Sequence, residues 1–393
     1  MSVSVEAFLA WQDWSFPVPI AYGPGRIRDL PRYCQRAGMQ NPLVVTDRLS
    51  RALPFVSQVR GLIEAAGLRV DVFSEVSPNP RDHEILEARS AFRRGSHDGV
   101  IALGGGSGMD AGKATCLIAD NEMDLFSFDY NRDSPVLSKD RRFPPLICVP
   151  TTAGTGAETE STAMVTDTAQ GMKLCVWHPE LKPAVALLDP ELTVSAPRNI
   201  TAWTGIDALV HAIEAYCVPD CHPMCDGIAL QAIELIWPAL PLVVNDPEHL
   251  AARGAMQVGA CLAGVAFLKG LGLVHAISHM VGAHYDTHHG LTNAVVLPAV
   301  LEFNAAHIAH KVGPLSSAMG LGTADFEGLY RAVCSLLDDL EIPVALEALG
   351  VPVAAAHELA QKAALDTAAS SNPRPASVQE LEGIVLKAIA KGR

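Results

Sequence analysis

The sequence lacks the features that mark membrane-spanning, secreted and nucleic-acid-binding chains. No uninterrupted apolar run reaches about 18 residues, so no membrane span is expected. The N-terminus has no basic start followed by an apolar stretch and a small-residue cleavage site, so no secretory signal is expected. A net charge of −14 has the wrong sign for a protein that neutralises phosphates. We therefore expect a cytoplasmic protein with no nucleic-acid or membrane partner.

Charged residues are also scarce. They make up 18% of the 393 positions, whereas hydrophobic residues make up 49%. This balance excludes a mainly disordered chain, because it supplies enough apolar side chains to bury large cores. The length allows two or three domains.

A disulfide framework is missing as well, because the nine cysteines are odd in number and irregularly spaced. The one cluster is Cys217, Cys221 and Cys225. Pro219 and Pro223 interrupt a continuous helix there, and structural zinc sites usually contain more closely spaced cysteine pairs. We expect buried, reduced thiols rather than a metal site.

The two halves of the chain differ in their hydrophobic patterns. Residues 1–195 alternate short apolar runs with helical stretches over 55–66 and 83–94. The expected strands are 42–46, 69–73, 99–103, 146–149 and 184–188. Strands and helices alternating at this spacing predict βαβ units and a parallel sheet that is covered on both faces.

The second half, residues 196–393, carries helical patterns. They cover 202–216, 223–243, 250–268, 274–285, 326–337 and 378–390. The expected fold class is therefore an α/β domain over 1–195 followed by an all-helical domain over 196–393. A cleft between the two domains is the default place for a ligand.

A glycine-rich turn follows the third expected strand, running from Gly104 to Lys113. Glycines let backbone N–H groups approach an anion, and a helix N-terminus carries partial positive charge, so a pyrophosphate fits there. The pattern is neither GxGxxG nor GxxxxGK[ST], and a tight turn without a ligand is the alternative. Asp47 ends the first strand, where a carboxylate can bind a ribose and favour NAD over NADP, or merely cap a helix.

Histidines are concentrated near residue 280. Five of the fourteen lie between residues 275 and 289: His275, His279, His284, His288 and His289. Upstream, Asp207 and His211 are four residues apart on an expected helix, so both can point to one side. His288–Gly290 is expected to form a turn. A lone histidine is more often a packed or surface residue, but a carboxylate with several imidazoles predicts an Fe²⁺ or Zn²⁺ site.

In combination, these motifs resemble the iron-containing (group III) alcohol dehydrogenase family. The matching segments are Gly104–Ser107 with Asp110 and Lys113, Pro150–Gly156, Asp207 with His211, Gly272–His275 with His279, His289–Gly290, and Ser371–Arg374. The resemblance runs in order from Gly23 to near the C-terminus. It implies a Rossmann-like nucleotide-binding domain, a helical metal-binding domain, and reversible hydride transfer between NAD(H) and a primary alcohol or aldehyde. It also implies a homodimer or a larger homo-oligomer.

The resemblance also implies roles for individual residues. The metal ligands would be Asp207, His211, His275 and His289, with His279 as the catalytic residue that relays a proton. The metal would be Fe²⁺ or Zn²⁺, and the cofactor NAD rather than NADP. The cofactor-binding residues would be Asp47, Asn79, Gly105, Gly106, Ser107, Asp110, Thr151, Thr152, Lys173 and Leu192.

Some positions depart from the family pattern. His288 stands where members usually have proline, and Glu160 and Thr162 replace residues that in many members contact the cofactor. The segment before His275 is shortened and introduces Lys269. One hypothesis is that Lys269 faces the substrate pocket and pairs with an acidic group on the substrate; the alternative is an exposed lysine at a helix start.

Two other functions share this general pattern. One is a metal-independent reductase resembling maleylacetate reductases, which lack the full ligand set. The other is a carbon–oxygen lyase resembling dehydroquinate synthases, which needs a pocket rich in basic residues. The segments around the expected ligands contain few basic residues apart from Lys269, which favours the dehydrogenase.

Overall fold

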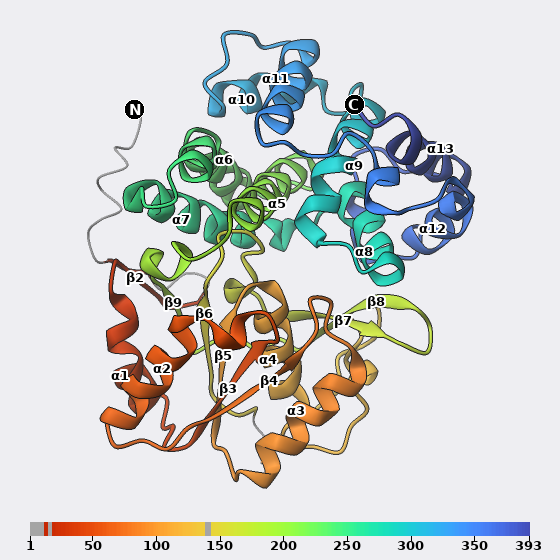
Figure 1. Cartoon of the computed structure of the whole chain (residues 1–393). Helices are drawn as coiled ribbons and strands as arrows, with labels where there is room; N and C mark the ends of the chain where they lie inside the picture. Colours follow the sequence, from red (N-terminus) through yellow and green to blue (C-terminus); the bar gives the residue numbers. More distant parts are fainter. Residues whose placement is uncertain (1–11, 15–17, 138–142) are drawn as a thin grey trace. The chain divides into compact units, whose positions relative to one another are not determined.

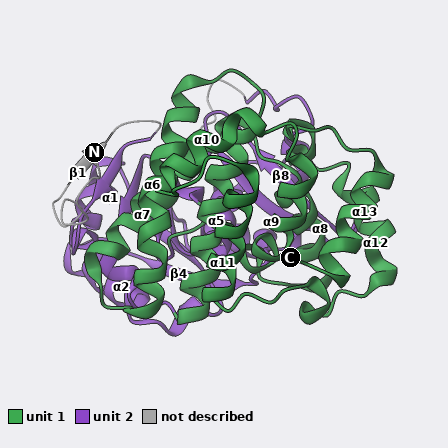
Figure 2. Cartoon of the chain, turned by 90° about the horizontal axis from the view of Figure 1, so that it is seen from above, with its two compact units in different colours: residues 1–2, 153–155, 197–393 green, residues 3–152, 156–196 purple. Residues whose placement is uncertain are grey.

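The computed structural model describes residues 12–14, 18–137 and 143–393 (Figure 1). Its contacts divide the chain into two compact units, coloured separately in Figure 2. The sheet unit comprises residues 3–152 and 156–196, and the helical unit comprises 153–155 and 197–393.

The sheet unit is built on a parallel sheet, as the sequence predicts. Within the described residues, seven strands form this sheet in the order β1-β2-β9-β6-β5-β3-β4, and β1 alone runs antiparallel to its neighbour. The strands are β1 (Gln12–Trp14), β2 (Ile20–Tyr22), β3 (Pro42–Asp47), β4 (Asp71–Val76), β5 (Gly99–Gly104), β6 (Leu146–Pro150) and β9 (Val185–Leu188). The expected strand 69–73 begins two residues later, at Asp71. A separate antiparallel hairpin, β7 (Thr162–Asp167) with β8 (Met172–Trp177), was not predicted.

Alternate residues of the central strands feed two hydrophobic cores, one on each face of the sheet. Leu43 and Val45 of β3 pack in one core, and Val44 between them packs in the other. The side chains on both faces are almost fully buried, because helices cover both faces of the parallel sheet. The first core includes residues of α3 (Asp82–Arg94) and α4 (Gly106–Ile118), and the second includes residues of α1 (Leu30–Arg36) and α2 (Pro54–Ala65).

The helical unit contains only helices and loops in its described residues, again as expected. The helices are α5 (Arg198–Cys217), α6 (Pro223–Asn245), α7 (Leu250–Ala266), α8 (Leu273–Tyr285), α9 (His289–Asn304), α10 (Ala309–Ala318), α11 (Phe326–Asp339), α12 (Ala356–Ala363) and α13 (Val378–Ala390). Of these, α9, α10 and α12 were not predicted. In Figure 1, α5 lies among α6, α7 and α9, all of which it contacts.

Two segments of this unit, α6 and residues 250–269, are long and apolar enough to cross a membrane by length and composition alone. Core helices of soluble proteins pass the same test. The apolar window of the second segment is 83% buried in the protein, and that of α6 is 50% buried. Their length is therefore weak evidence for a membrane span.

The cysteine cluster is interrupted as predicted, since α5 ends at Cys217 and α6 begins at Pro223. All nine cysteines are free, and most are buried.

Candidate metal centre

The central helix α5 carries two of the expected metal ligands. Asp207 and His211 lie one turn apart in a stretch of α5 that is buried on all sides. Gly205 allows this close packing, because a Cβ built there would lie 2.4 Å from Cδ1 of Leu240 on α6. The helix therefore holds both side chains inside the unit rather than at its surface.

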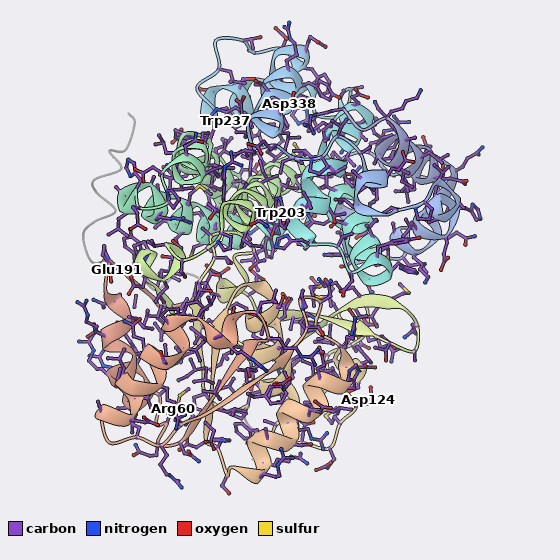
Figure 3. The ribbon with its side chains drawn as sticks, in the orientation of Figure 1. Arg60, Asp124, Glu191, Trp203, Trp237 and Asp338 are labelled. Carbon is purple, nitrogen blue, oxygen red and sulfur yellow. The ribbon has the colours of Figure 1, made fainter. Side chains whose placement is uncertain are left out.

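The other two expected ligands come from α8 and α9. His275 lies in the first turn of α8, and His289 is the first residue of α9. A Cβ built on Gly290 would lie only 2.3 Å from the carbonyl oxygen of Trp203, which is labelled on α5 in Figure 3. The glycine thus lets the start of α9 lie against α5, next to Asp207.

The four side chains converge on one point. The Nε2 atoms of the three histidines lie 4.0 Å (His211), 3.7 Å (His275) and 3.5 Å (His289) from Oδ1 of Asp207. Two donors that each bind one ion at about 2.1 Å lie at most about 4.2 Å apart, so these spacings suit a single cation. The ligand atoms all lie within 4.8 Å of one another, in the one such group among the described residues.

The amide of Asn293 gives a second test of whether the donors fit a cation. Its Nδ2 lies 2.6 Å from Oδ1 of Asp207 and 3.2 Å from Nε2 of both His275 and His289. Acceptor atoms from α5, α8 and α9 therefore surround the NH₂ group of Asn293, whose hydrogens carry partial positive charge. A carboxylate and three imidazoles aimed at a common point form a donor set suited to Fe²⁺ or Zn²⁺.

The charges of the cluster are set by burial and by mutual contact. Burial alone would raise the pKa of the Asp207 carboxyl, but the three imidazoles outweigh it and hold the pKa well below its ordinary value. Burial lowers the pKa of His211 to about 3, against the attraction of Asp207. Burial also opposes protonation of His275, but the nearby carboxylates of Asp207 and Glu214 raise its pKa to about 9. The site thus presents an anionic carboxylate beside a neutral His211.

His279 lies beside this cluster but is not one of its four members. Its ring stacks on that of His289, with centroids 5.3 Å apart and planes 13° apart. Its Nδ1 lies 2.9 Å from Oδ2 of Asp366, whose other oxygen accepts a hydrogen bond from the Ala368 amide. An ionised carboxylate only accepts hydrogen bonds, so this contact assigns the donor role to Nδ1 and leaves Nε2 as the other nitrogen of the ring.

The glycine-rich turn joins β5 to α4 in the sheet unit. Gly104 has φ +134°, which an L side chain rarely adopts, and α4 begins two residues later, at Gly106. A Cβ on Gly108 would lie 2.5 Å from the carbonyl oxygen of Leu103. The glycines therefore bring the helix N-terminus close against the strand. The first amides of a helix lack partners within it, which makes such a place suitable for an anion.

Several expected cofactor residues gather around this turn. Ser107 Oγ donates to the carbonyl of Pro78 at 2.5 Å, and the ammonium of Lys173 donates to Oδ1 of the adjacent Asn79 at 3.3 Å. The Thr151 amide donates to the carbonyl of Gly104 at 2.8 Å. Strands β5 and β6 thus bring Ser107 and Thr151 to the same edge of the sheet.

Of the remaining expected cofactor residues, Asp47, Asp110 and Thr152 also lie at this turn or on the helix that it opens. Asp47 accepts hydrogen bonds from the Leu49 and Ser50 amides and from the Ser50 hydroxyl, just before the short 3-10 helix Ser50–Ala52. The N-cap of that helix is Leu49, so Asp47 closes the turn before the helix and does not cap it. Leu192 packs in the core that includes α1 and α2. Asp110 lies 3.8 Å from the ammonium of Lys113. The Thr152 side chain lies beside Gly105: a Cβ built on Gly105 would be 3.4 Å from it.

Lys269 does not behave as the substrate hypothesis expects. Its ammonium is buried and lies 2.5 Å from Oδ1 of Asp226 on α6, so the acidic partner is supplied by the protein itself. The alternative of an exposed lysine is also wrong, since the side chain is 1% exposed. The hypothesis failed because a contact across 43 residues leaves no local pattern.

The structure also shows the surroundings of two other residues that depart from the family pattern, His288 and Glu160. His288 is the N-cap of α9, where its Nδ1 accepts the Leu291 amide at 3.5 Å, so the expected turn at 288–290 is in fact a helix start. Burial raises the pKa of Glu160 to about 7, and its Oε1 has no hydrogen-bond partner among the described residues.

Three residues of the centre were missed by sequence reasoning. Glu214 contacts His275, Asn293 contacts the ligand atoms, and Asp366 contacts His279. Helical spacing could have indicated the first two, since Glu214 follows His211 by three residues and Asn293 follows His289 by four. Asp366 has no such signal, because it is 87 residues from its partner.

Comparison with known proteins agrees with this geometry. The family described as "Iron-containing alcohol dehydrogenase" matches residues 17–190, and "Fe-containing alcohol dehydrogenase family, C-terminal" matches residues 201–389. The NAD-dependent methanol dehydrogenase of Bacillus methanolicus is 36% identical over 95% of this chain and 98% of its own length. The 1,3-propanediol dehydrogenase of Klebsiella pneumoniae is 35% identical over 96% of this chain and 98% of its own length. A crystal structure of a 1,3-propanediol oxidoreductase superposes with a TM-score of 0.88 and 34% identity, covering 97% of this chain and 100% of that one.

Proposed function

The chain belongs to the iron-containing alcohol dehydrogenase family, and we propose how its own residues carry out the reaction. It is a metal-dependent, NAD(H)-linked alcohol dehydrogenase or aldehyde reductase. The reaction moves a hydride between the carbon of an alcohol and the nicotinamide, and a proton between the oxygen and the protein or solvent.

We assign the metal to Asp207, His211, His275 and His289. The observation that carries this assignment is the convergence of three Nε2 atoms on one carboxylate oxygen inside a buried site. When bound, Fe²⁺ or Zn²⁺ supplies Lewis acidity that stabilises negative charge on the substrate oxygen. Asp207 supplies one negative charge to the site, and three of the four donors are buried while His289 is partly exposed.

We assign the proton transfer to His279. Its Nδ1–H is held by Asp366, so Nε2 is the atom that can accept a proton during alcohol oxidation and return it during aldehyde reduction. Stacking on His289 fixes the plane of the ring.

The nucleotide is proposed to bind at the glycine-rich turn, with its pyrophosphate at the start of α4. Gly105, Gly106 and Ser107 would contact the phosphates. The other proposed contacts are Asp47, Asn79, Asp110, Thr151, Thr152, Lys173 and Leu192. NAD is preferred to NADP because the Asp47 carboxylate would repel a 2′-phosphate.

Three further properties are part of the proposal. The domain boundary is placed at residues 195/196, next to the division between the two compact units. The protein is proposed to be cytoplasmic, from its acidic net charge of −14, and to form a homodimer or larger homo-oligomer, from the family resemblance. Light scattering on the purified protein tests the last point: a mass of one chain, 41.7 kDa, would contradict it.

The experiment that tests the function is an NADH oxidation assay with a panel of short aldehydes, and NAD⁺ reduction with the matching alcohols. Stoichiometric change in NADH is expected, dependent on Fe²⁺ or Zn²⁺. A lyase that uses NAD transiently would convert substrate without net NADH, and a metal-independent reductase would keep its activity after chelation. Either result would overturn the proposal.

A further inference from the structure

The carboxylate of Glu214 lies next to the metal centre without belonging to its donor set. Glu214 is on α5, three residues after His211, and is buried. Its Oε2 lies 2.6 Å from Nδ1 of His275, on the opposite side of the ring from the nitrogen that faces Asp207. The two carboxylates therefore contact the same imidazole at its two nitrogens.

The second oxygen of Glu214 is also used. Oε1 accepts a hydrogen bond from the Val274 amide at 2.8 Å, in the first turn of α8. The N-cap of this helix is Gly272, which has no side chain to cap it, and the Leu273 amide is instead capped by Oδ1 of Asn372 at 3.2 Å. Glu214 thus fixes both the backbone and the ring of the segment that carries His275.

Gly272 provides the space for this arrangement. A Cβ built there would lie 2.6 Å from Oε1 of Glu214 and 2.9 Å from Oδ1 of Asn372. Its φ of −147° is open to any residue, so space rather than backbone conformation requires glycine at this position.

We propose that Glu214 is a positioning residue that holds His275 as the Nδ1–H tautomer, so that Nε2 offers its lone pair to the metal. The inference rests on the proposed metal site. An ionised carboxylate only accepts hydrogen bonds, so it requires a proton on Nδ1. A metal-bound imidazole keeps one N–H, so any proton on Nε2 would be released on metal binding while the proton on Nδ1 stays with Glu214. The negative charge also makes the ring a stronger donor to a cation.

A glutamine at this position cannot reproduce both contacts. The Val274 amide and the required Nδ1–H of His275 are both donors, whereas a carboxamide has one oxygen and one NH₂ group. If its oxygen accepts from Val274, its NH₂ faces Nδ1 and forces the proton onto Nε2, the atom meant for the metal. If its oxygen accepts from His275, its NH₂ opposes the Val274 amide.

The test is a titration of metal-free protein with Co²⁺, following its visible absorption bands. Glu214→Gln is expected to weaken Co²⁺ binding about 10- to 100-fold and to change the absorption spectrum, in line with the loss of other carboxylate partners of metal-bound histidines. Asp366→Asn is the matched control, because it alters a buried carboxylate on a histidine outside the donor set. It is expected to leave the dissociation constant within about threefold of wild type, since the four donors stay intact.

Two more variants separate the ring contact from the capping contact. Asn372→Ala removes the other cap of α8 and should leave Co²⁺ affinity close to wild type. Gly272→Ala should weaken binding as Glu214→Gln does, because its Cβ displaces the carboxylate, and it decides the matter if Glu214→Gln does not fold. Thermal unfolding of each metal-free variant reports on folding.

The outcomes distinguish the inference from the function on which it rests. The inference is overturned if Glu214→Gln binds Co²⁺ as tightly as wild type, or if Asn372→Ala weakens binding equally. In both cases a metal-binding wild type leaves the proposed function intact. If the wild type itself does not bind Co²⁺, the metal assignment fails first.

Discussion

Replacing Asp366 by asparagine is expected to slow turnover by acting through His279. The carboxylate lies 2.9 Å from Nδ1 of His279 through Oδ2 and 2.9 Å from the Ala368 amide through Oδ1. Both partners are donors, and asparagine offers a single oxygen. If that oxygen keeps the Ala368 amide, the NH₂ group faces Nδ1 and moves the imidazole proton to Nε2, the atom that must accept a proton during oxidation.

The size of the effect follows from the contribution of general base catalysis. A positioned acid or base contributes about 10²- to 10⁴-fold, so kcat for alcohol oxidation should fall at least about 100-fold, equivalent to about 2.7 kcal/mol of barrier. KM for the alcohol and the metal content should change little, because neither substrate contacts nor metal donors are altered. Steady-state NAD⁺ reduction with parallel elemental analysis measures all three.

A double-mutant cycle shows whether the effect passes through His279. In a His279→Ala background, Asp366→Asn should cost little further activity, because the group on which it acts is already gone. Equal losses in both backgrounds would refute the reasoning and indicate that Asp366 acts only on the fold of the 367–371 turn.

Two other predictions concern buried charges outside the centre. Burial raises the pKa of Glu158 from 4.5 to about 7, so the folded state holds this proton more tightly than the unfolded chain. Its contribution to the free energy of unfolding should therefore fall as pH rises from about 4.5 to 7, by about 3 kcal/mol, and Glu158→Gln should flatten that fall in thermal unfolding. An unchanged pH profile in the variant would contradict this. Lys269→Met should lower the unfolding temperature, because it removes a partner of Asp226. It should leave KM unchanged for acidic and for neutral aldehydes. A rise in KM for acidic aldehydes alone would restore the substrate hypothesis.

The fold was largely accessible from the sequence because its signals are local. Continuous apolar runs at 42–46 and 99–103 predict buried parallel strands, and both form as β3 and β5. The hairpin of β7 and β8 was missed, although the two strands pair in register from Thr162 and Trp177 to Asp167 and Met172. Its strands lie outside the parallel sheet and are only partly buried, so they lack the continuous apolar pattern of the core strands.

The metal centre was accessible to different degrees. Helical spacing pairs Asp207 with His211, and the family resemblance adds His275 and His289, which the structure brings together with them. The supporting shell was not accessible, because its contacts join residues far apart in the chain: Glu214 to His275 across 61 positions, and Asp366 to His279 across 87. Lys269 was misjudged for the same reason, because its ion pair with Asp226 joins residues that are distant in the chain and leaves no pattern in the sequence.

The most direct test of the central claim is the metal content of the purified protein beside that of His275→Ala. We predict about one Fe or Zn per wild-type chain, and loss of both metal and NADH-dependent aldehyde reduction in the variant, because one of four convergent donors is gone. Full turnover by a protein with no bound metal would contradict the assignment of Asp207, His211, His275 and His289 as a catalytic metal site.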